Sequence, residues 1–263
     1  MKLLVCLVTY NRLAYTQRTI KSLLQTISCP YYLIVVDNAS NDGTQSWLRQ
    51  QKKLGHINHL ILNKQNLYPG KACNIGWSKG LAKYTRATYL MRLDNDMRFY
   101  EGWANKVPKY FAEIHNLGQL GIDYVNPQTV PQKTFVWQPY GNGDGYQFVS
   151  KLKVKDVTIV VWPGNVGGPC IIKRELWDKG LRYDESPWQD DNTLDHFPTQ
   201  EDAKLCIDIL KLGYTYGTAG QKLAQTFAVQ SNWDEYPQYY IQTLTERGYH
   251  RFRPDIIDKL RSV

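Results

Sequence analysis

The sequence lacks a long apolar run. No stretch approaches the roughly 18 consecutive apolar residues that a membrane-spanning helix needs. The opening MKLLVCLV runs directly into TYNR without a small-residue cleavage site, so we interpret it as a buried strand rather than a signal peptide. We therefore expect no transmembrane segment.

The sequence also lacks the residue pairs of several common active sites. The five cysteines are scattered without a CxxC pair, and the five histidines form no HxH or HExxH pattern. No GxSxG nucleophile elbow is present. These absences argue against a zinc site, a histidine-based metal site and covalent hydrolase chemistry. The unpaired cysteines favour a reduced, cytoplasmic setting, with peripheral membrane association left open.

Repeats, low-complexity tracts and linkers are absent as well. Hydrophobic residues make up 43% of the chain and charged residues 21%, which excludes a largely disordered chain. We expect one domain over residues 1–263. The net charge of +8 favours anionic partners such as nucleotides, nucleic acids or acidic lipid headgroups.

What is present is an alternation of short apolar runs and helical periodicity. We expect buried strands over residues 3–8, 31–36, 60–62, 89–93, 157–162 and 170–172. Apolar spacing and turn signals predict helices over a segment carrying Ile20 to Ile27, from the turn at 40–44 to Leu54, and over 71–84, 174–179 and 201–212. This order predicts an α/β fold with a central, mostly parallel sheet flanked by helices. Segments 141–145 and 183–200 read as loops, and Lys151, Lys153 and Lys155 as a solvated edge.

Polar residues end three of these strands, at Asp37, Asn63 and Asp94. In a parallel sheet the chemistry lies beyond the carboxyl ends of the strands. Asp94-Asn95-Asp96 has a DxD spacing that can hold Mg²⁺ or Mn²⁺, and such a cation can grip a diphosphate. The alternative is a turn in which an Asp caps the next segment.

A second acidic pair, Glu201-Asp202, begins a predicted helix. A carboxylate there is stabilised by the helix dipole and can accept a proton from a hydroxyl. Plain helix capping is the alternative.

Aromatic residues are abundant, with 8 Trp and 19 Tyr. Trp162 and Trp188 lie in the second half of the chain. Rings of this kind pack on sugar faces or stack on bases, although core packing also explains such residues. Basic and aromatic residues interleave over 247–253, which suits phosphate and ring contacts or a solvated C-terminal segment.

Taken in order, several blocks resemble one family. They are VTYNR at 8–12, VVDNASNDGT at 35–44, residues 63–76, LDND at 93–96, GGPCII at 167–172, YDE at 183–185 and QED at 200–202. They resemble the family 2 glycosyltransferases of GT-A fold. The resemblance implies a metal-assisted, inverting transferase that uses a nucleoside diphosphate sugar, with a UDP-sugar favoured. It also implies a donor-binding half over 1–100, an acceptor half over 101–225 and a C-terminal helical tail over 226–263.

The resemblance also implies residue roles. Asp37 and Thr9 would line the base pocket, Asp94 the ribose or donor sugar, and Asp202 would be the base. Asp96, with Asp94, would hold the metal, and His250 is a candidate further ligand because residues 214–221 contain no His. The remaining predicted residues are Tyr10, Asn11, Arg12, Asn38, Asn63, Lys71, Asn74 and Asn95 for the donor, Glu201 beside the base, and Trp162, Gly168 and Trp188 for the acceptor.

Alternatives stay open at this stage. We place a glycan acceptor first and a hydroxylated base in DNA second, since the positive charge suits a nucleic acid. A nucleotidyltransferase would need a glycine-rich loop after the first strand, and residues 9–13 contain no glycine. A non-catalytic binding protein is disfavoured by the intact acidic residues.

Overall fold

The computed structural model describes residues 1–124, 133–137, 146–161, 166–185, 200–226, 236–238 and 241. Loop 141–145, Trp162, Trp188, His250, most of 183–200 and nearly all of 226–263 lie outside these ranges. The elements are β1 (Leu3–Thr9), α1 (Leu13–Thr26), β2 (Tyr31–Asp37), α2 (Thr44–Lys53), β3 (His59–Leu62), α3 (Pro69–Lys83), β4 (Tyr89–Asp94), β5 (Met97–Phe99), α4 (Trp103–Glu113), β6 (Leu117–Gly121), β7 (Lys133–Trp137), β8 (Tyr146–Val154), β9 (Val157–Val161), β10 (Cys170–Lys173), α5 (Arg174–Asp178), α6 (Gln200–Lys211), β11 (Thr215–Ala219) and β12 (Ala224–Thr226).

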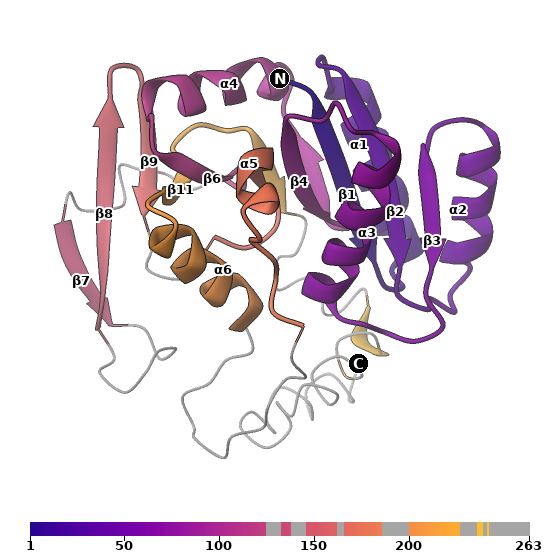
Figure 1. Ribbon diagram of the computed structural model, residues 1–263. Helices are drawn as coiled ribbons and strands as arrows, with labels where there is room; N and C mark the ends of the chain where they lie inside the picture. The colour runs from indigo at the N-terminus through magenta and orange to yellow at the C-terminus, as the bar shows by residue number, and fades with distance from the viewer. Residues whose placement is uncertain are drawn as a thin grey trace.

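One sheet organises the described strands, in the order β3-β2-β1-β4-β10-β6-β11-β9-β8-β7 (Figure 1). Strands β3, β2, β1 and β4 pair with one another in parallel. From β10 onward the pairing is mixed, with β6 and β11 parallel and the other pairs antiparallel. The α/β prediction is thus confirmed, with the parallel pairing concentrated in the N-terminal half.

Strand periodicity divides the core between the two faces of the sheet. In β1, Leu3, Val5 and Leu7 pack on the face covered by α1, α2 and α4. The alternate side chains of β1 join the opposite face, under α3, α5 and α6. Each fully buried side chain of this size stabilises the fold by about 1.5–3 kcal/mol.

Close approach of α3 to the sheet depends on two glycines. A Cβ at Gly76 would collide with the sulfur of Cys6 and come within 2.9 Å of Val36. A Cβ at Gly80 would lie 2.9 Å from Leu4. Glycine at these positions therefore sets the depth at which α3 lies on β1 and β2.

A small second sheet brings the end of the described chain back to the DxD turn. Strand β12 pairs with β5, which directly follows Asp96, and Ala224 also bridges to Asp123. Asp123 is thereby placed near the carboxylates at the end of β4. Among the helices of the described ranges, none has the length and hydropathy needed to cross a bilayer.

Candidate active site

The three predicted strand ends meet at one edge of the sheet. The register pairs Thr9 at the end of β1 with Asp37, and Val8 with Asp94. Asp37 in turn pairs with Leu62, the residue before Asn63. We call this edge the strand-end rim.

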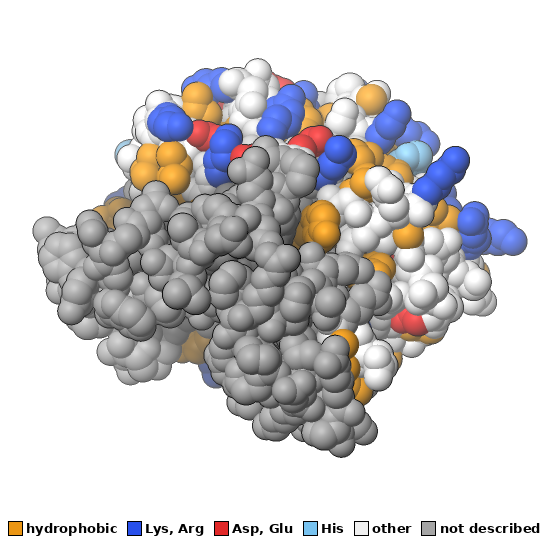
Figure 2. Space-filling view, turned by 90° about the horizontal axis from the view of Figure 1, so that it is seen from below, with side chains coloured by type: hydrophobic (Ala, Val, Ile, Leu, Met, Phe, Trp, Pro, Cys, Tyr) orange, Lys and Arg blue, Asp and Glu red, His pale blue; other side chains and the backbone are white. Residues whose placement is uncertain are grey.

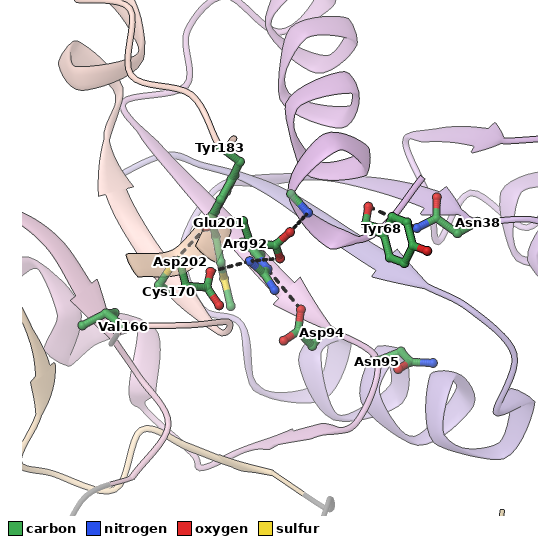
Figure 3. Close-up of polar contacts among 12 residues, drawn as sticks. Asn38, Tyr68, Arg92, Asp94, Asn95, Val166, Cys170, Tyr183, Glu201 and Asp202 are labelled. Atoms are coloured by element: carbon green, nitrogen blue, oxygen red, sulfur yellow. Dashed lines mark hydrogen bonds and ion pairs between the residues drawn. The ribbon is translucent and has the colours of Figure 1, made fainter. Parts of the chain in front are cut away.

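A buried arginine, Arg92, lies at the centre of the acidic residues (Figure 3). Its Nη1 donates to Asp202 Oδ1 at 2.7 Å and lies 3.3 Å from Glu201 Oε1. Its Nε donates to Asp94 Oδ1 at 3.3 Å. Arg92 and Asp94 share a face because they are two residues apart on β4. One guanidinium therefore joins the DxD turn to the start of α6.

These charges shift the proton affinities of the group. Burial would lower the pKa of Arg92, but Asp202 and Asp94 hold it well above its usual value, so the guanidinium stays charged. For Asp202, burial is the largest cause; Arg92 opposes it and Glu201 and Asp94 add to it, which together raises the pKa of Asp202 to about 7. A carboxylate with this pKa can take up and release a proton near neutral pH.

Glu201 makes a contact with each of its two carboxylate oxygens. Its Oε2 accepts a hydrogen bond from the backbone N–H of Gly70 at 3.2 Å, while Oε1 faces Arg92. A Cβ at Gly70 would lie 2.9 Å from that Oε2 and 3.0 Å from Tyr183. The Tyr183 ring also packs under the Arg92 guanidinium, with the carbon of the guanidinium 5.1 Å from the ring centre. Glu201 therefore ties α6 to the N-terminus of α3.

Gly167 and Gly168 lie directly against the two acids. A Cβ at Gly168 would come within 2.6 Å of Asp94 Oδ2. A Cβ at Gly167 would lie 3.1 Å from Asp202 Oδ2, the oxygen opposite the one that Arg92 holds. The structure thus places Gly168, predicted as an acceptor residue, beside the DxD carboxylate.

Asn95, the middle residue of the DxD turn, is buried and ties the turn to β1 and α1. Its Nδ2 donates to Thr9 Oγ1, Thr16 Oγ1 and the Asn11 carbonyl at 3.0–3.1 Å. Its Oδ1 accepts from Arg12 Nη2 at 2.5 Å. These hydrogen bonds of Asn95 fix the backbone that carries Asp94 and Asp96.

Arg12 and Asn11 adopt the left-handed backbone conformation, with φ of 57° and 53°. This conformation costs free energy for non-glycine residues and persists where contacts fix it. The Asn11 N–H donates to Ser40 Oγ at 2.7 Å, and Arg12 Nη1 forms an ion pair with Asp96 at 3.1 Å. The strained backbone conformation thus brings the cationic side chain of Arg12 to Asp96 of the DxD turn.

A divalent cation is the cofactor that the DxD spacing predicts. Within the described ranges no group of three or more His, Cys, Asp or Glu is arranged to hold a metal. Asp94 and Asp96 nevertheless fit a hard cation, because each ion pair with arginine engages one carboxylate oxygen and the other is a hard donor. Burial raises the pKa of Asp96 and of nearby Asp123, and the DxD carboxylates raise that of Asp123 further. This crowding of negative charge favours binding of a cation.

Asp37, the last residue of β2, is fully buried. Its Oδ1 accepts from the Ser40 N–H at 2.9 Å and Gln45 Nε2 at 2.8 Å. Its Oδ2 is buried and has no hydrogen-bond partner among the described residues. An unpaired buried carboxylate oxygen costs free energy, which a ligand N–H would recover.

The other predicted donor residues divide into two groups. Asn38 and Asn63 stand beside Asp37, joined by a 2.9 Å hydrogen bond, and half-buried Tyr10 follows Thr9. Asn74 instead holds the segment before α6: its side chain bonds the Tyr183 backbone and Glu185. Lys71 lies 3.7 Å from Glu185, each side chain nearly half exposed.

Three site residues were not predicted from the sequence. Arg92 interrupts an apolar strand, and a charge inside a predicted buried strand is a signal that could have found it. Tyr183 belongs to the YDE block at 183–185, which was given no role for the tyrosine itself. Asp123 gave no signal, because the pairing of β12 with β5 brings it to the site from a distant part of the chain.

Comparison with known proteins agrees with this geometry. The model for "Glycosyl transferase family 2" matches residues 4–179, and the chain belongs to this family. No curated protein matches the sequence significantly.

Solved structures share the fold at low sequence identity. S. aureus TarS, residues 1–349, is 17% identical with a TM-score of 0.55, covering 94% of this chain and 65% of that one. Mannosyltransferase PcManGT from Pyrobaculum calidifontis, in complex with GDP-Man and Mn²⁺, is 16% identical with a TM-score of 0.59 and coverages of 95% and 64%. GalNAc-T7 with UDP, GalNAc and Mn²⁺ is 15% identical, with a TM-score of 0.61 and coverages of 100% and 56%. The chain therefore spans about two thirds of the length of the first two and little more than half of GalNAc-T7.

Proposed function

We infer that the protein transfers a sugar from a nucleoside diphosphate donor to an acceptor hydroxyl with inversion at the anomeric carbon. The observation that carries this proposal is the Arg92 contact, since one buried cation holds Asp94 of the DxD turn and Asp202 of α6 together. A direct displacement needs a base on the acceptor side and a stabilised leaving group on the other. Structures that share this fold hold UDP or GDP-Man with Mn²⁺, which supports the donor class.

The hydrogen bonds of Asp37 support UDP as the nucleotide. Because Oδ1 already accepts two hydrogen bonds, only Oδ2 is free to accept one from a base. Uracil offers a single ring N–H, whereas guanine offers a ring N–H and an amino group side by side. One free oxygen therefore suits uracil better.

Asp202 is the base in this proposal. Arg92 holds its Oδ1, and Oδ2, facing Gly167, takes the proton of the acceptor hydroxyl. The acceptor oxygen forms a bond to the anomeric carbon as the bond from that carbon to the diphosphate oxygen breaks. Glu201, held by Gly70 and Arg92, keeps the start of α6 in place.

Asp94 and Asp96 would hold the divalent cation, Mg²⁺ or Mn²⁺. When bound, the cation supplies positive charge that stabilises the leaving diphosphate. Arg12, already paired with Asp96, contributes a further positive charge on the same side.

A glycan hydroxyl stays our preferred acceptor. Among the described residues the strand-end rim is acidic, which disfavours a DNA backbone beside the base. The predicted acceptor residues Trp162 and Trp188 lie outside the described ranges.

The experiment is replacement of the base. Asp202→Asn keeps the shape of the side chain and an oxygen for Arg92, so we expect UDP binding to persist while sugar transfer falls by about 10²-fold or more. Transfer from a UDP-sugar and UDP binding by calorimetry are measured together. The matched control is Asp208→Asn, the same change on the exposed side of α6, where Asp208 pairs with Lys204 and Lys211. Undiminished transfer in the Asp202 variant would reject Asp202 as the base.

A further inference from the structure

The positive charge of the chain is concentrated in its first hundred residues. These carry 14 Lys and Arg against 4 Asp and Glu, a net charge of +10, whereas residues 101–263 have a net charge of −2. All four acids, Asp37, Asp42, Asp94 and Asp96, follow the ends of strands, at or near the strand-end rim. The opposite edge, where these strands begin, receives no acid from this half of the chain.

Basic residues gather at that opposite edge, near the N-terminus in Figure 1. Lys2 precedes β1, Lys52 and Lys53 end α2, Lys79 and Lys83 occupy the last turns of α3, and Arg86 precedes β4. We call these six residues the basic rim.

Contacts connect three members of the basic rim, Lys2, Lys52 and Lys83. The rings of Tyr32 and Tyr84 stack at 4.1 Å, with Lys2 Nζ 4.9 Å from the Tyr32 ring centre and Lys83 Nζ 5.6 Å from that of Tyr84. The carbonyl of Asn58 accepts from both Tyr84 Oη and Lys52 Nζ. Lysines from three elements thus converge on one pair of rings.

The lysines also crowd His59 at the start of β3. Burial, followed by Lys83, Lys52 and Lys79, lowers the pKa of His59. Among the described residues, no carboxylate forms an ion pair with any member of the basic rim. Elsewhere on the molecule some exposed lysines are paired, as in Lys109–Asp156 and Lys155–Glu113. Figure 2, which views the strand-end side, likewise shows acidic beside basic side chains along its upper margin.

Helix dipoles account for part of this pattern. Lys52, Lys53 and Lys83 lie in the last turns of their helices, where cations are favourable. The dipoles do not account for Lys2 or Arg86, nor for the lack of acidic partners. A surface with positive charges and no neighbouring carboxylates has a positive potential, which attracts an anionic partner.

Three features identify the partner. The faces of Tyr32 and Tyr84 are covered by each other and by lysines, so they offer no stacking platform for nucleic acid bases. Leu54, which follows Lys52 and Lys53, is 60% exposed, an apolar side chain beside cations. Lysine also outnumbers arginine five to one here, whereas arginine is the usual choice for nucleic acids.

We propose that the basic rim is a docking surface for an anionic phospholipid membrane, with the ammonium groups on the lipid phosphates and Leu54 entering the interface. Each lysine near such a surface strengthens binding about fivefold at low salt. A chain docked in this way holds the strand-end rim at the far end of the strands, away from the bilayer. This proposal is independent of the transfer chemistry.

The test is co-sedimentation of the full chain with vesicles of phosphatidylcholine, with and without about one third phosphatidylserine. We expect binding to the anionic vesicles only, weakening steeply as salt shortens the screening length. The variant Lys52→Gln/Lys79→Gln/Lys83→Gln should bind roughly a hundredfold more weakly. The matched control, Lys204→Gln/Lys211→Gln/Lys222→Gln, removes the same charge from α6 and from the turn before β12, and should bind within about twofold of wild type. Leu54→Ser should weaken binding without changing its salt dependence.

Each other outcome overturns the proposal. Equal losses in the two triple variants would mean that net charge rather than this surface is responsible. Absence of vesicle binding together with a salt-sensitive shift of duplex DNA or single-stranded RNA would assign the basic rim to nucleic acid instead. Nucleotide binding, measured in the same variants, should be unchanged, which separates this result from a failure of the transferase proposal or of folding.

Discussion

At the scale of single residues, Arg92 forms ion pairs with more carboxylates than any other described residue of the candidate site. Its side chain is buried and contacts three carboxylates, and removing one partner of a buried ion pair costs about 3–5 kcal/mol. We expect Arg92→Met to lower the free energy of unfolding by an amount of this order at alkaline pH. The loss should be smaller near pH 5, where Asp202 is protonated. Urea denaturation at the two pH values measures both.

Arg92 also lowers the pKa of Asp202. Without that charge the pKa should rise further above 7, and activity at neutral pH should fall about tenfold for each unit of the rise. Arg92→Lys keeps a charge and should show the smaller shift of the acid limb of kcat/KM. Identical pH profiles for the two variants would contradict this electrostatic role.

The raised pKa of Asp202 predicts that both stability and activity depend on pH. Because its pKa is raised from 3.8 to about 7, the folded protein retains a proton over that window that the unfolded chain has released. Stability contributed by this group is therefore present below 3.8 and is lost as pH rises to about 7. The activity that needs the ionised base should rise over the upper part of the same window.

Stability and activity should thus run in opposite directions between the two pKa values. Calorimetric melting temperatures and kcat/KM across the window measure the two trends in the same protein. In Asp202→Asn the decline in stability between pH 4 and 7 should become shallower. An unchanged decline in this variant would assign it to other groups.

At the scale of elements, the position of α3 depends on Gly76. In Gly76→Ala the new Cβ would meet Cys6 and Val36, both buried in the sheet, so helix or strand must shift. We expect a loss of about 1–3 kcal/mol in the free energy of unfolding, despite the better helix propensity of alanine. Ser78→Ala on the exposed side of α3 should change stability by no more than about 0.5 kcal/mol. Equal stabilities for the two variants would refute the close-approach argument.

Most elements of the first hundred residues could be predicted within one or two residues, although β5 (Met97–Phe99) and the start of α1 at Leu13 were not predicted. The expected strand at 31–36 is β2 (Tyr31–Asp37), and the expected helix at 71–84 is α3 (Pro69–Lys83). Parallel strands buried on both faces are continuous apolar runs, and the helices between them are amphipathic, so the pattern alone is sufficient there.

In the second half of the chain the hydrophobic pattern does not predict several of the elements. Strand β6 (Leu117–Gly121) carries two glycines and a glutamine, yet it is fully buried. A Cβ at Gly118 would meet Tyr214, and one at Gly121 would meet Thr218 and Val166, so tertiary packing selects glycine over strand propensity. Helix α4 contains Pro108 and was not predicted. Lys151 and Lys153, read as a solvated edge, lie within β8.

At the scale of the whole molecule, the candidate site joins parts of the chain that the sequence separates widely. The DxD turn and the Asp37 end could be predicted from strand order. The link from Arg92 to Asp202 spans 110 residues, and the approach of Asp123 depends on β12 returning to β5. Both arise only when the mixed half of the sheet closes on the parallel half.

Ligand binding should stabilise the whole fold, because the arrangement around Asp37 and the DxD turn both exist only in the folded chain. At a hundred times its dissociation constant a ligand adds about 2.7 kcal/mol, or roughly 5–10 °C in Tm for a chain of this size. We expect UDP with Mn²⁺ to raise Tm by more than the two separate effects combined, and chelation by EDTA to remove the increment.

Two variants separate the increase in Tm produced by UDP from the further increase produced by Mn²⁺. Asp37→Asn places an amide where the base N–H would donate to the free oxygen, so it should abolish the shift produced by UDP alone. Asp96→Asn should keep the UDP shift and lose the Mn²⁺ increment, since it removes a charged oxygen ligand. Glu101→Gln, an exposed acid beyond β5, should behave as wild type. A full Mn²⁺ increment in the Asp96 variant would remove Asp96 from the metal site, and a full UDP shift in the Asp37 variant would place the base elsewhere.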